Sequence, residues 1–359
     1  MNPLLQVRQH GQQIWLDNLS RTLLNEGQLA RLLSDDGVAG ITTNPAIFQK
    51  AIAGGRYYEE DLTALKQEAL SAEQRYERLV IPDVRRACDM LLPLFRDSSG
   101  AAGYVSLEVS PELAADTAGT VAAGLRLAKE VARPNLLIKV PATPAGLEAI
   151  EALIGHGISV NVTLMFSLAH VDAVALAYVR GLERLRASGG DPGSVMSVAS
   201  LFLSRVDTLV DHQLETIGTP AALALRGTSA VSTAKLAYAR YRERFHGAEF
   251  AVLRAAGARP QYMLWASTGT KNPAYSDLLY VEPLIGPETV NTLPDGTLNA
   301  LRDHGKVAST LTDGIDEARA HHAALAGCGI DLSAAGEQLQ KEGLAQFDEA
   351  FAKLLAATA

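Results

Sequence analysis

The feature that most constrains this chain is a series of eight short runs rich in aliphatic and β-branched residues, separated by longer stretches with helical spacing. Several runs are apolar on both faces, including LLIKV at 136–140 and VNVTLMF at 160–166. Parallel strands covered by helices have this pattern, whereas half-exposed antiparallel strands alternate. The pattern predicts an α/β protein with parallel strands at Ile14–Asp17, Val38–Thr43, Tyr104–Val109, Leu136–Val140, Ser159–Phe166, Val195–Leu203, Tyr262–Ser267 and Thr289–Leu293.

Eight strands fit a TIM (β/α)8 barrel, and the intervening periodicity predicts helices at Leu113–Ala132, Ala145–Gly155, Leu168–Ala187 and Ser204–Ile217. Three stretches exceed an ordinary barrel connection: helical insertions at about 50–102 and 225–250, and a helical C-terminal tail at about 300–359. Two domains would also suit the length, but no linker or internal repeat divides the chain. We therefore expect a single barrel domain over residues 1–359.

A doubly wound open sheet remains an alternative, because a sequence does not show whether a sheet closes. The glycine-rich dinucleotide fingerprint that such a sheet often carries after its first strand is missing. The barrel is therefore the favoured architecture.

Charge and composition narrow the functional classes. The chain has 32 Lys+Arg and 40 Asp+Glu, a net charge of −8 with the signs interspersed, which argues against a nucleic-acid-binding surface. Its longest uncharged apolar stretch, Gly157–Leu168, is too short for the ~20 residues of a membrane span, and the N-terminus lacks the pattern of a signal peptide. We therefore expect a cytoplasmic protein without nucleic-acid or membrane partners.

Cysteine and histidine show no metal-ligand spacing. Cys88 and Cys328 are far apart in apolar helical contexts, so we expect reduced core thiols. The eight histidines contain no HExxH pattern, and we expect no metal site. His321 and His322 lie in an alanine-rich helical segment and are expected to face solvent.

Lys139 is the residue that says most about function. It stands within LLIKV, where every neighbour is apolar. Burial disfavours the charged form of a lysine, and the neutral amine is the form that attacks a carbonyl to give a Schiff base. Lys139 is thus a candidate nucleophile. A strand-end lysine paired with a buried carboxylate accounts for the same pattern, and the residue alone does not decide between them.

Further polar residues fall at the ends of predicted strands. Asp17 ends the first strand and Glu108 the third, and barrel enzymes build their active sites at the carboxyl ends of strands. With Lys139 they would form an acid/base set, although each acid alone could be a helix N-cap or a salt-bridge partner. Asn161 and Thr163 are two residues apart, so they share one face of a buried strand and need polar partners there.

Five segments occur in a characteristic order and spacing: ITTNPAIF, SLEVSP, LLIKVPAT, VNVTLMFS and ASLFLSRVD. They resemble the transaldolases, Schiff-base enzymes that act on sugar phosphates in the pentose phosphate pathway, and the match extends over essentially the whole chain. Two later segments, LWASTGTKNPAYSD and YVEPLIGPETVNTLP, resemble the longer bacterial subgroup of that family.

The resemblance implies a cofactor-free and metal-free TIM barrel in which Lys139 forms a ketimine with the C2 carbonyl of a donor ketose phosphate. It implies that Asp17 takes the proton from the C4 hydroxyl as the C3–C4 bond breaks, and returns one to the acceptor aldehyde. Glu108 and Thr163 would hold the water used in carbinolamine dehydration and hydrolysis.

The resemblance also implies a set of donor-binding residues. Asn44 and Asn161 match asparagines that hydrogen-bond the dihydroxyacetone unit, and Ser200 matches a serine at the donor carbonyl. Taken alone, Asn44 precedes a proline and reads equally well as an ordinary turn residue.

Two phosphate-binding positions follow from the same comparison. Arg205 matches an arginine that grips phosphate, a task suited to its forked guanidinium, although an ion pair with Asp207 or Asp211 would also explain it. Ser267 and Lys271, in STGTK, stand where shorter transaldolases have Ser-Phe-Arg, so whether Lys271 replaces that arginine depends on the loop, which has an ordinary turn composition.

We therefore expect a transaldolase that moves dihydroxyacetone from sedoheptulose 7-phosphate to glyceraldehyde 3-phosphate, giving erythrose 4-phosphate and fructose 6-phosphate, as a monomer or homodimer. One alternative is a fructose 6-phosphate aldolase, but those chains are much shorter and, in the family, use a tyrosine in the water-activating role that Glu108 would fill here. Another is a non-catalytic sugar-phosphate-binding barrel, against which the intact Lys139, Asp17 and Glu108 set argues.

Overall fold

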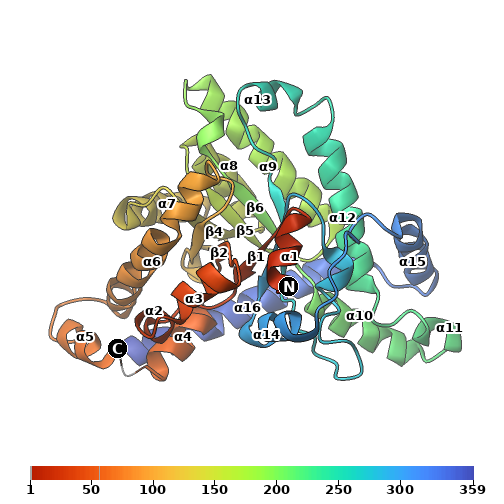
Figure 1. The fold of residues 1–359 in the computed structure, drawn as a ribbon, viewed down its shortest axis with the longest axis horizontal. Helices are drawn as coiled ribbons and strands as arrows, with labels where there is room; N and C mark the ends of the chain where they lie inside the picture. The colour runs from red at the N-terminus through yellow and green to blue at the C-terminus, as the bar shows by residue number, and fades with distance from the viewer. Residues whose placement is uncertain (1, 56) are drawn as a thin grey trace.

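A closed barrel of eight parallel strands forms the centre of the structure, a computed structural model that describes residues 2–55 and 57–359 (Figure 1). Each strand pairs with its neighbours in chain order, and the last pairs with the first. The barrel prediction is confirmed and the open sheet is excluded. The strands are β1 (Gln12–Leu16), β2 (Gly40–Ile41), β3 (Tyr104–Glu108), β4 (Leu136–Pro141), β5 (Val160–Met165), β6 (Ser197–Phe202), β7 (Tyr262–Ala266) and β8 (Thr289–Leu293).

Helices surround this barrel. Those up to β4 are α1 (Pro3–Gln9), α2 (Arg21–Asn25), α3 (Gln28–Asp35), α4 (Pro45–Ala53), α5 (Glu59–Leu65), α6 (Ala72–Asp97) and α7 (Thr117–Val131), with a 3-10 turn η1 (Pro111–Leu113). Those between β4 and β7 are α8 (Pro144–Gly155), α9 (Leu168–Ala187), α10 (Ser204–Ile217), α11 (Pro220–Leu223), α12 (Ser229–His246) and α13 (Ala251–Ala255), with η2 (Pro192–Ser194). After β7 come η3 (Glu282–Leu284), α14 (Asp295–His304), α15 (Ile315–Gly327) and α16 (Leu332–Thr358).

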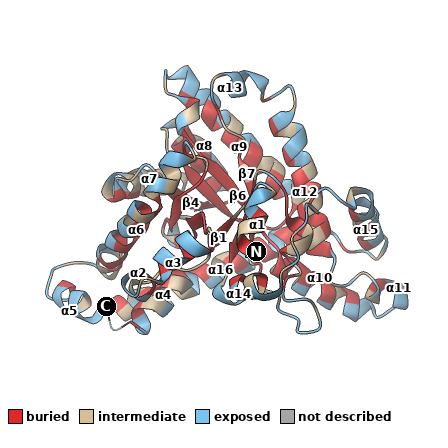
Figure 2. Cartoon of the chain, in the orientation of Figure 1, coloured by how far each residue is buried: buried red, intermediate tan, exposed pale blue. Residues whose placement is uncertain are grey.

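The sequence signals for helix starts explain these boundaries. Thr143 accepts a hydrogen bond from the Gly146 amide and precedes Pro144 at the first position of α8, and Ser167 caps α9 in the same way. All four predicted helices are present, with α7 beginning a few residues later than expected because η1 occupies its start. Figure 2 shows the strands buried along almost their whole length and most helices buried on one face only.

The long C-terminal helix α16 packs across one end of the barrel (Figure 1). It contacts α4 and α6 on one side, α9 and α10 on the other, and β5 between them. The Arg75 Nε donates to the Thr358 carbonyl at 2.7 Å and fixes the end of the helix. The tail is therefore part of the barrel's packing. Within the described residues, no helix has the length and apolar character needed to cross a membrane.

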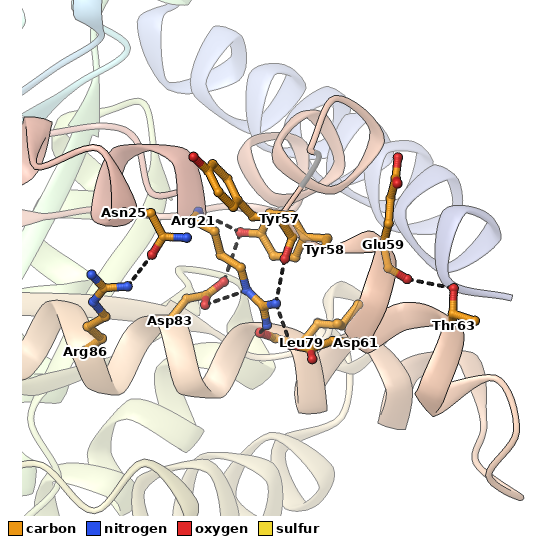
Figure 3. A network of polar contacts seen from close by, with 10 residues as sticks. All are labelled: Arg21, Asn25, Tyr57, Tyr58, Glu59, Asp61, Thr63, Leu79, Asp83 and Arg86. Atoms are coloured by element: carbon orange, nitrogen blue, oxygen red, sulfur yellow. Dashed lines mark hydrogen bonds and ion pairs between the residues drawn. The ribbon is translucent and has the colours of Figure 1, made fainter.

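A polar network joins the first barrel helix to the insertion before β3 (Figure 3). Arg21 on α2 pairs with Asp61 on α5 at 2.5 Å and with Asp83 on α6 at 2.9 Å. Tyr58 donates to the other oxygen of Asp83 at 2.9 Å, and its ring lies 4.5 Å from the Arg21 guanidinium. One arginine, largely shielded from solvent, thus ties α5 and α6 to the segment that follows β1.

The expectation that His321 and His322 face solvent is wrong. His321 is buried and its Nε2 lies 3.0 Å from the Ser229 hydroxyl, while His322 Nε2 lies 3.1 Å from the Thr233 hydroxyl. Both contacts form because α15 packs against α12. The two cysteines are free as expected, but only Cys88 is fully buried.

Candidate functional site

A cavity of about 230 Å³ opens at the carboxyl ends of the strands, beneath α16. Seven of the predicted site residues line it: Asp17, Asn44, Lys139, Thr163, Ser200, Arg205 and Ser267. A larger hollow of about 610 Å³ lies elsewhere, between α6 and α7, and no strand-end residue lines it. The chemistry-bearing residues therefore gather in the smaller cavity, at the end where barrel enzymes place their active sites.

Strand register places Lys139 in the middle of the site. Glu108, Lys139 and Asn161 are direct partners across β3, β4 and β5. Lys139 is 5% exposed, and its Nζ donates to the Thr43 carbonyl at 2.9 Å. The Glu108 Oε2 lies 3.6 Å from the same Nζ. The buried-carboxylate reading of Lys139 is thus realised in the structure, and it places an acid beside a candidate nucleophile.

Burial controls the protonation of Glu108. Loss of solvent raises the pKa of Glu108 to about 7, an effect opposed by the nearby Lys139 ammonium. The Glu108 Oε2 and the Thr163 Oγ1 are both buried and have no hydrogen-bond partner among the described residues. Buried polar atoms of this kind normally bind water or ligand. These two atoms come from the strands on either side of β4. Thr163 lines the cavity, whereas Glu108 lines a separate small hollow bordered by α6 and by Phe351 of α16, so Glu108 reaches the site through its contact with Lys139.

Asp17 lines the same cavity as Lys139. It directly follows β1 and accepts a hydrogen bond from the Thr42 hydroxyl at 2.8 Å. Burial raises the pKa of Asp17, while the Lys139 charge and the Thr42 hydrogen bond oppose this shift. Thr42 was not singled out from the sequence, although it adjoins the TNP turn and lines the cavity.

The two asparagines occupy different places. The Asn44 side chain caps α4 by accepting from the Ile47 amide at 3.0 Å, so it acts as a turn residue while also lining the cavity. Asn161 is fully buried and does not line the cavity. Its amide donates to Ser106 at 2.9 Å and accepts from Ser200 at 2.8 Å. Asn161 therefore orients Ser200, and Ser106 is a supporting residue that sequence reasoning missed.

Arg205 is free of the ion pairs that could have explained it. Asp207 accepts from the Ala230 amide and from Tyr280, and Asp211 accepts from Gly227 and Tyr275. The Arg205 Nη1 is buried and has no hydrogen-bond partner among the described residues. Burial lowers the pKa of Arg205. A guanidinium nitrogen without a partner beside a cavity is suited to bind an anion.

The structure places Ser267 at the cavity and Lys271 away from it. The Ser267 hydroxyl lies 2.8 Å from the Ser204 hydroxyl at the start of α10, close in sequence to Arg205, and Ser267 lines the cavity. Lys271 is exposed and does not line the cavity. The loop after β7 thus brings the serine to the site and leaves the lysine outside it.

Helix α16 supplies cavity residues that the sequence did not indicate. Gln346, Phe347 and Ala350 line the cavity, and the Phe347 ring centroid lies 5.8 Å from the Lys139 Nζ. No group of three or more His, Cys, Asp or Glu side chains in residues 2–55 and 57–359 is arranged to hold a metal ion. The available chemistry is that of an amine, two carboxylates, hydroxyls and a guanidinium.

Comparisons with known proteins agree over nearly the whole chain. The family model described as Transaldolase/Fructose-6-phosphate aldolase matches residues 14–358. A protein named Transaldolase from Thiobacillus denitrificans is 57% identical over 356 residues, covering 99% of both chains. The Transaldolase of Neisseria gonorrhoeae is 50% identical over the same shares, and Transaldolase 1 of Streptomyces coelicolor is 47% identical over 99% of this chain and 93% of its own.

Proposed function

Because the chain belongs to the transaldolase/fructose-6-phosphate aldolase family, we propose that it transfers a dihydroxyacetone unit from sedoheptulose 7-phosphate to glyceraldehyde 3-phosphate through a Schiff base on Lys139. The products are erythrose 4-phosphate and fructose 6-phosphate. We place this reaction in the non-oxidative pentose phosphate pathway, in the cytoplasm, and assign it to a single domain formed by the whole chain. The observation that carries the proposal is the buried Lys139 amine, which lines a cavity at the strand ends together with Asp17 and has the Glu108 carboxylate 3.6 Å from its Nζ.

Covalent catalysis follows from the position of Lys139. The amine attacks the C2 carbonyl of the donor, and loss of water gives an iminium that accepts the electron pair of the C3–C4 bond as it breaks. The electron pair of the broken C3–C4 bond forms the C2=C3 double bond of an enamine, and the iminium nitrogen takes up the C=N pair, so the nitrogen acts as the electron sink. Asp17 takes the C4 hydroxyl proton, which releases the aldehyde product, and gives a proton back when the enamine attacks the acceptor.

Glu108 and Thr163 support the steps that move water. Forming the iminium expels one water molecule and hydrolysing it consumes one. A carboxyl with a pKa of about 7 exchanges protons readily near neutral pH, and its unpartnered Oε2 is available to a water bound by the Thr163 hydroxyl. Asn44 and Ser200 line the cavity near Lys139 and are assigned to the hydroxyls of the three-carbon unit.

The phosphate of donor and acceptor is assigned to Arg205 with Ser267. The Arg205 Nη1 lacks a protein partner and Ser267 stands at the same end of the cavity. Arg205→Ala is expected to raise KM for phosphorylated substrates by about 10- to 100-fold, as the loss of a charge-assisted pair would, with little change for dihydroxyacetone-bearing donors without phosphate. Steady-state kinetics with both donor types tests this assignment, and equal losses on both would remove the phosphate role.

Trapping the covalent intermediate tests the central proposal. The protein is incubated with fructose 6-phosphate, reduced with borohydride, and digested for peptide mass analysis. The three-carbon adduct is expected on the peptide that contains Lys139. Lys139→Met, which preserves length and apolar packing, should remain folded and form no adduct. An adduct on another lysine, or turnover by the Met variant, would refute the assignment.

A further inference from the structure

Helix α16 covers the site from the solvent side. Its residues Gln346, Phe347 and Ala350 form part of the cavity wall. Phe347 is 9% exposed, and its ring centroid stands 5.8 Å from the Lys139 Nζ. An apolar ring therefore lies over the nitrogen to which the substrate would be joined.

The helix is held in this position by contacts to the strand ends. The Gln340 side-chain amide donates to the carbonyls of Ala142 and Leu164, both at 3.0 Å, which joins α16 to the ends of β4 and β5. Gly343 lets the helix approach closely, because a Cβ there would lie 3.0 Å from the Leu164 side chain. Gln340, Gly343 and Phe347 follow the three- and four-residue spacing of one helix face. Gln340 and Gly343, on the same face of α16, therefore hold Phe347 over the site.

The position matters because the reaction has a vulnerable intermediate. After the first aldehyde leaves, the enamine on Lys139 must persist until an acceptor aldehyde arrives. If the enamine carbon takes a proton, the result is an iminium, and addition of one water at C2 then gives a carbinolamine. That species collapses to dihydroxyacetone and the free lysine, and one proton is returned to solvent. The net loss is one water molecule consumed and one dihydroxyacetone released without transfer.

We propose that Phe347 is a specificity-determining residue whose ring keeps bulk water, as distinct from the single water assigned to Glu108 and Thr163, from the lysine-bound dihydroxyacetone, so that the unit passes to an aldehyde instead of being released. The inference rests on the proposed Schiff base at Lys139. Excluding water from a reactive intermediate is a general use of groups that close an active site. Gln346, beside Phe347, also lines the cavity but is exposed, so the cover that α16 gives the site is apolar at Phe347 and reaches solvent at Gln346.

The test compares release with transfer in matched variants. Wild type, Phe347→Ala and Phe347→Leu are given fructose 6-phosphate alone, and dihydroxyacetone release is measured by enzymatic assay. The same proteins are then given an erythrose 4-phosphate acceptor, and sedoheptulose 7-phosphate is measured. Phe347→Ala is expected to raise the release-to-transfer ratio about tenfold, because water then reaches the intermediate more easily. Phe347→Leu, which keeps most of the apolar cover, should raise it less, by about two- to threefold.

A variant at a second position on α16 distinguishes an effect of the Phe347 ring from a general loosening of the helix. Leu354 is fully buried on the same helix and does not line the cavity. Leu354→Ala should lower the unfolding temperature but leave the release-to-transfer ratio unchanged. The proposal is overturned if neither folded Phe347 variant raises the ratio, or if Leu354→Ala raises it equally. Borohydride trapping on Lys139 accompanies each assay, because a missing adduct in wild type would refute the Schiff base itself, whereas an adduct with an unchanged ratio refutes only the role of Phe347.

Discussion

At the scale of single residues, burial more than pairing sets the state of the two acids. Desolvation is the largest influence on the pKa of both Asp17 and Glu108, and the Lys139 charge only partly offsets it. Opposite charges inside a low-dielectric site would otherwise hold each carboxyl ionised well below neutral pH. A site that must both give and take protons gains from acids whose pKa lies closer to the pH of the cell.

Glu108→Gln tests whether the Glu108 carboxyl gives and takes protons near neutral pH. Burial raises the pKa of Glu108 to about 7, so the carboxyl is protonated below that pH and becomes a base for water above it. We expect kcat/KM of the wild type to rise through a limb near pH 7, and the Gln variant to lose this limb along with about 10²- to 10⁴-fold in kcat. A pH–rate profile measures both effects. A Gln variant with the same limb would assign it to another group.

The residues that sequence reasoning identified are those that carry a local signal. Lys139, Glu108 and Thr163 are polar positions in largely apolar strands. Parallel-strand register pairs Glu108 with Lys139 and sets Thr163 two residues further along, beside Pro141. Phe347 carries no such signal, since an aromatic residue on an amphipathic helix is most often a core residue. Its place over Lys139 depends on how α16 packs on the barrel, and a single sequence does not contain that information.

At the scale of elements, α10 provides the N-terminal cap of α12. Helix α12 has no side-chain cap from its own preceding residue. Asp207, on α10, accepts from the Ala230 amide at 2.8 Å instead, and Tyr280 donates to its other oxygen at 2.9 Å. Burial raises the pKa of Asp207 to about 6 despite these hydrogen bonds. The insertion after β6 is thus attached to the barrel through a buried carboxyl.

Asp207→Asn should change how stability depends on pH. Because the folded pKa is raised from 3.8 to about 6, the wild type loses stability as pH increases through that range, when a buried charge must form. Asparagine keeps an acceptor for Ala230 without ionising. As pH rises from about 5 to about 7.5, we therefore expect the wild type to lose about 1 to 2 kcal/mol of unfolding free energy that the variant keeps. Urea unfolding at both pH values measures this difference.

A surface acid provides the control for that experiment. Asp172 forms an ion pair with Arg240 in which both side chains are 43% exposed. Asp172→Asn should leave the pH dependence of unfolding nearly unchanged, because exposed pairs contribute little. If both variants behave alike, the effect does not arise from the buried cap.

Element prediction succeeded where periodicity and capping agree, and failed where packing between helices decided the outcome. The strands from β3 to β8 are close to their predicted bounds because each is an apolar run between turn signals. His321 and His322 were misplaced because α15 is rich in alanine, so its sequence scarcely marks which face is buried. Its contact with α12 fixes that face in the folded chain.

At the scale of the whole molecule, long-range polar contacts attach the extra helices to the barrel. The Arg21 guanidinium is only 12% exposed and Asp83 only 7%, whereas Asp61 is largely in solvent. The Asp83 carboxylate therefore relies on Arg21 and Tyr58 in place of water (Figure 3). Removing either Arg21 or Asp83 alone therefore leaves the other charge buried without its partner, which destabilises the fold.

Arg21→Ala should accordingly lower the free energy of unfolding by roughly 3 to 5 kcal/mol, since it leaves the Asp83 carboxyl buried without its counter-ion. Adding Asp83→Ala to the same chain should recover part of that loss, because the unpaired charge is removed with its partner. A double-mutant cycle by urea unfolding measures the coupling. The matched control is Arg126→Ala, whose guanidinium is 44% exposed beside Glu77 and should cost no more than about 1 kcal/mol. If Arg21→Ala costs no more than this control, α5 and α6 are held to the barrel by apolar packing alone, and the network in Figure 3 adds little to stability.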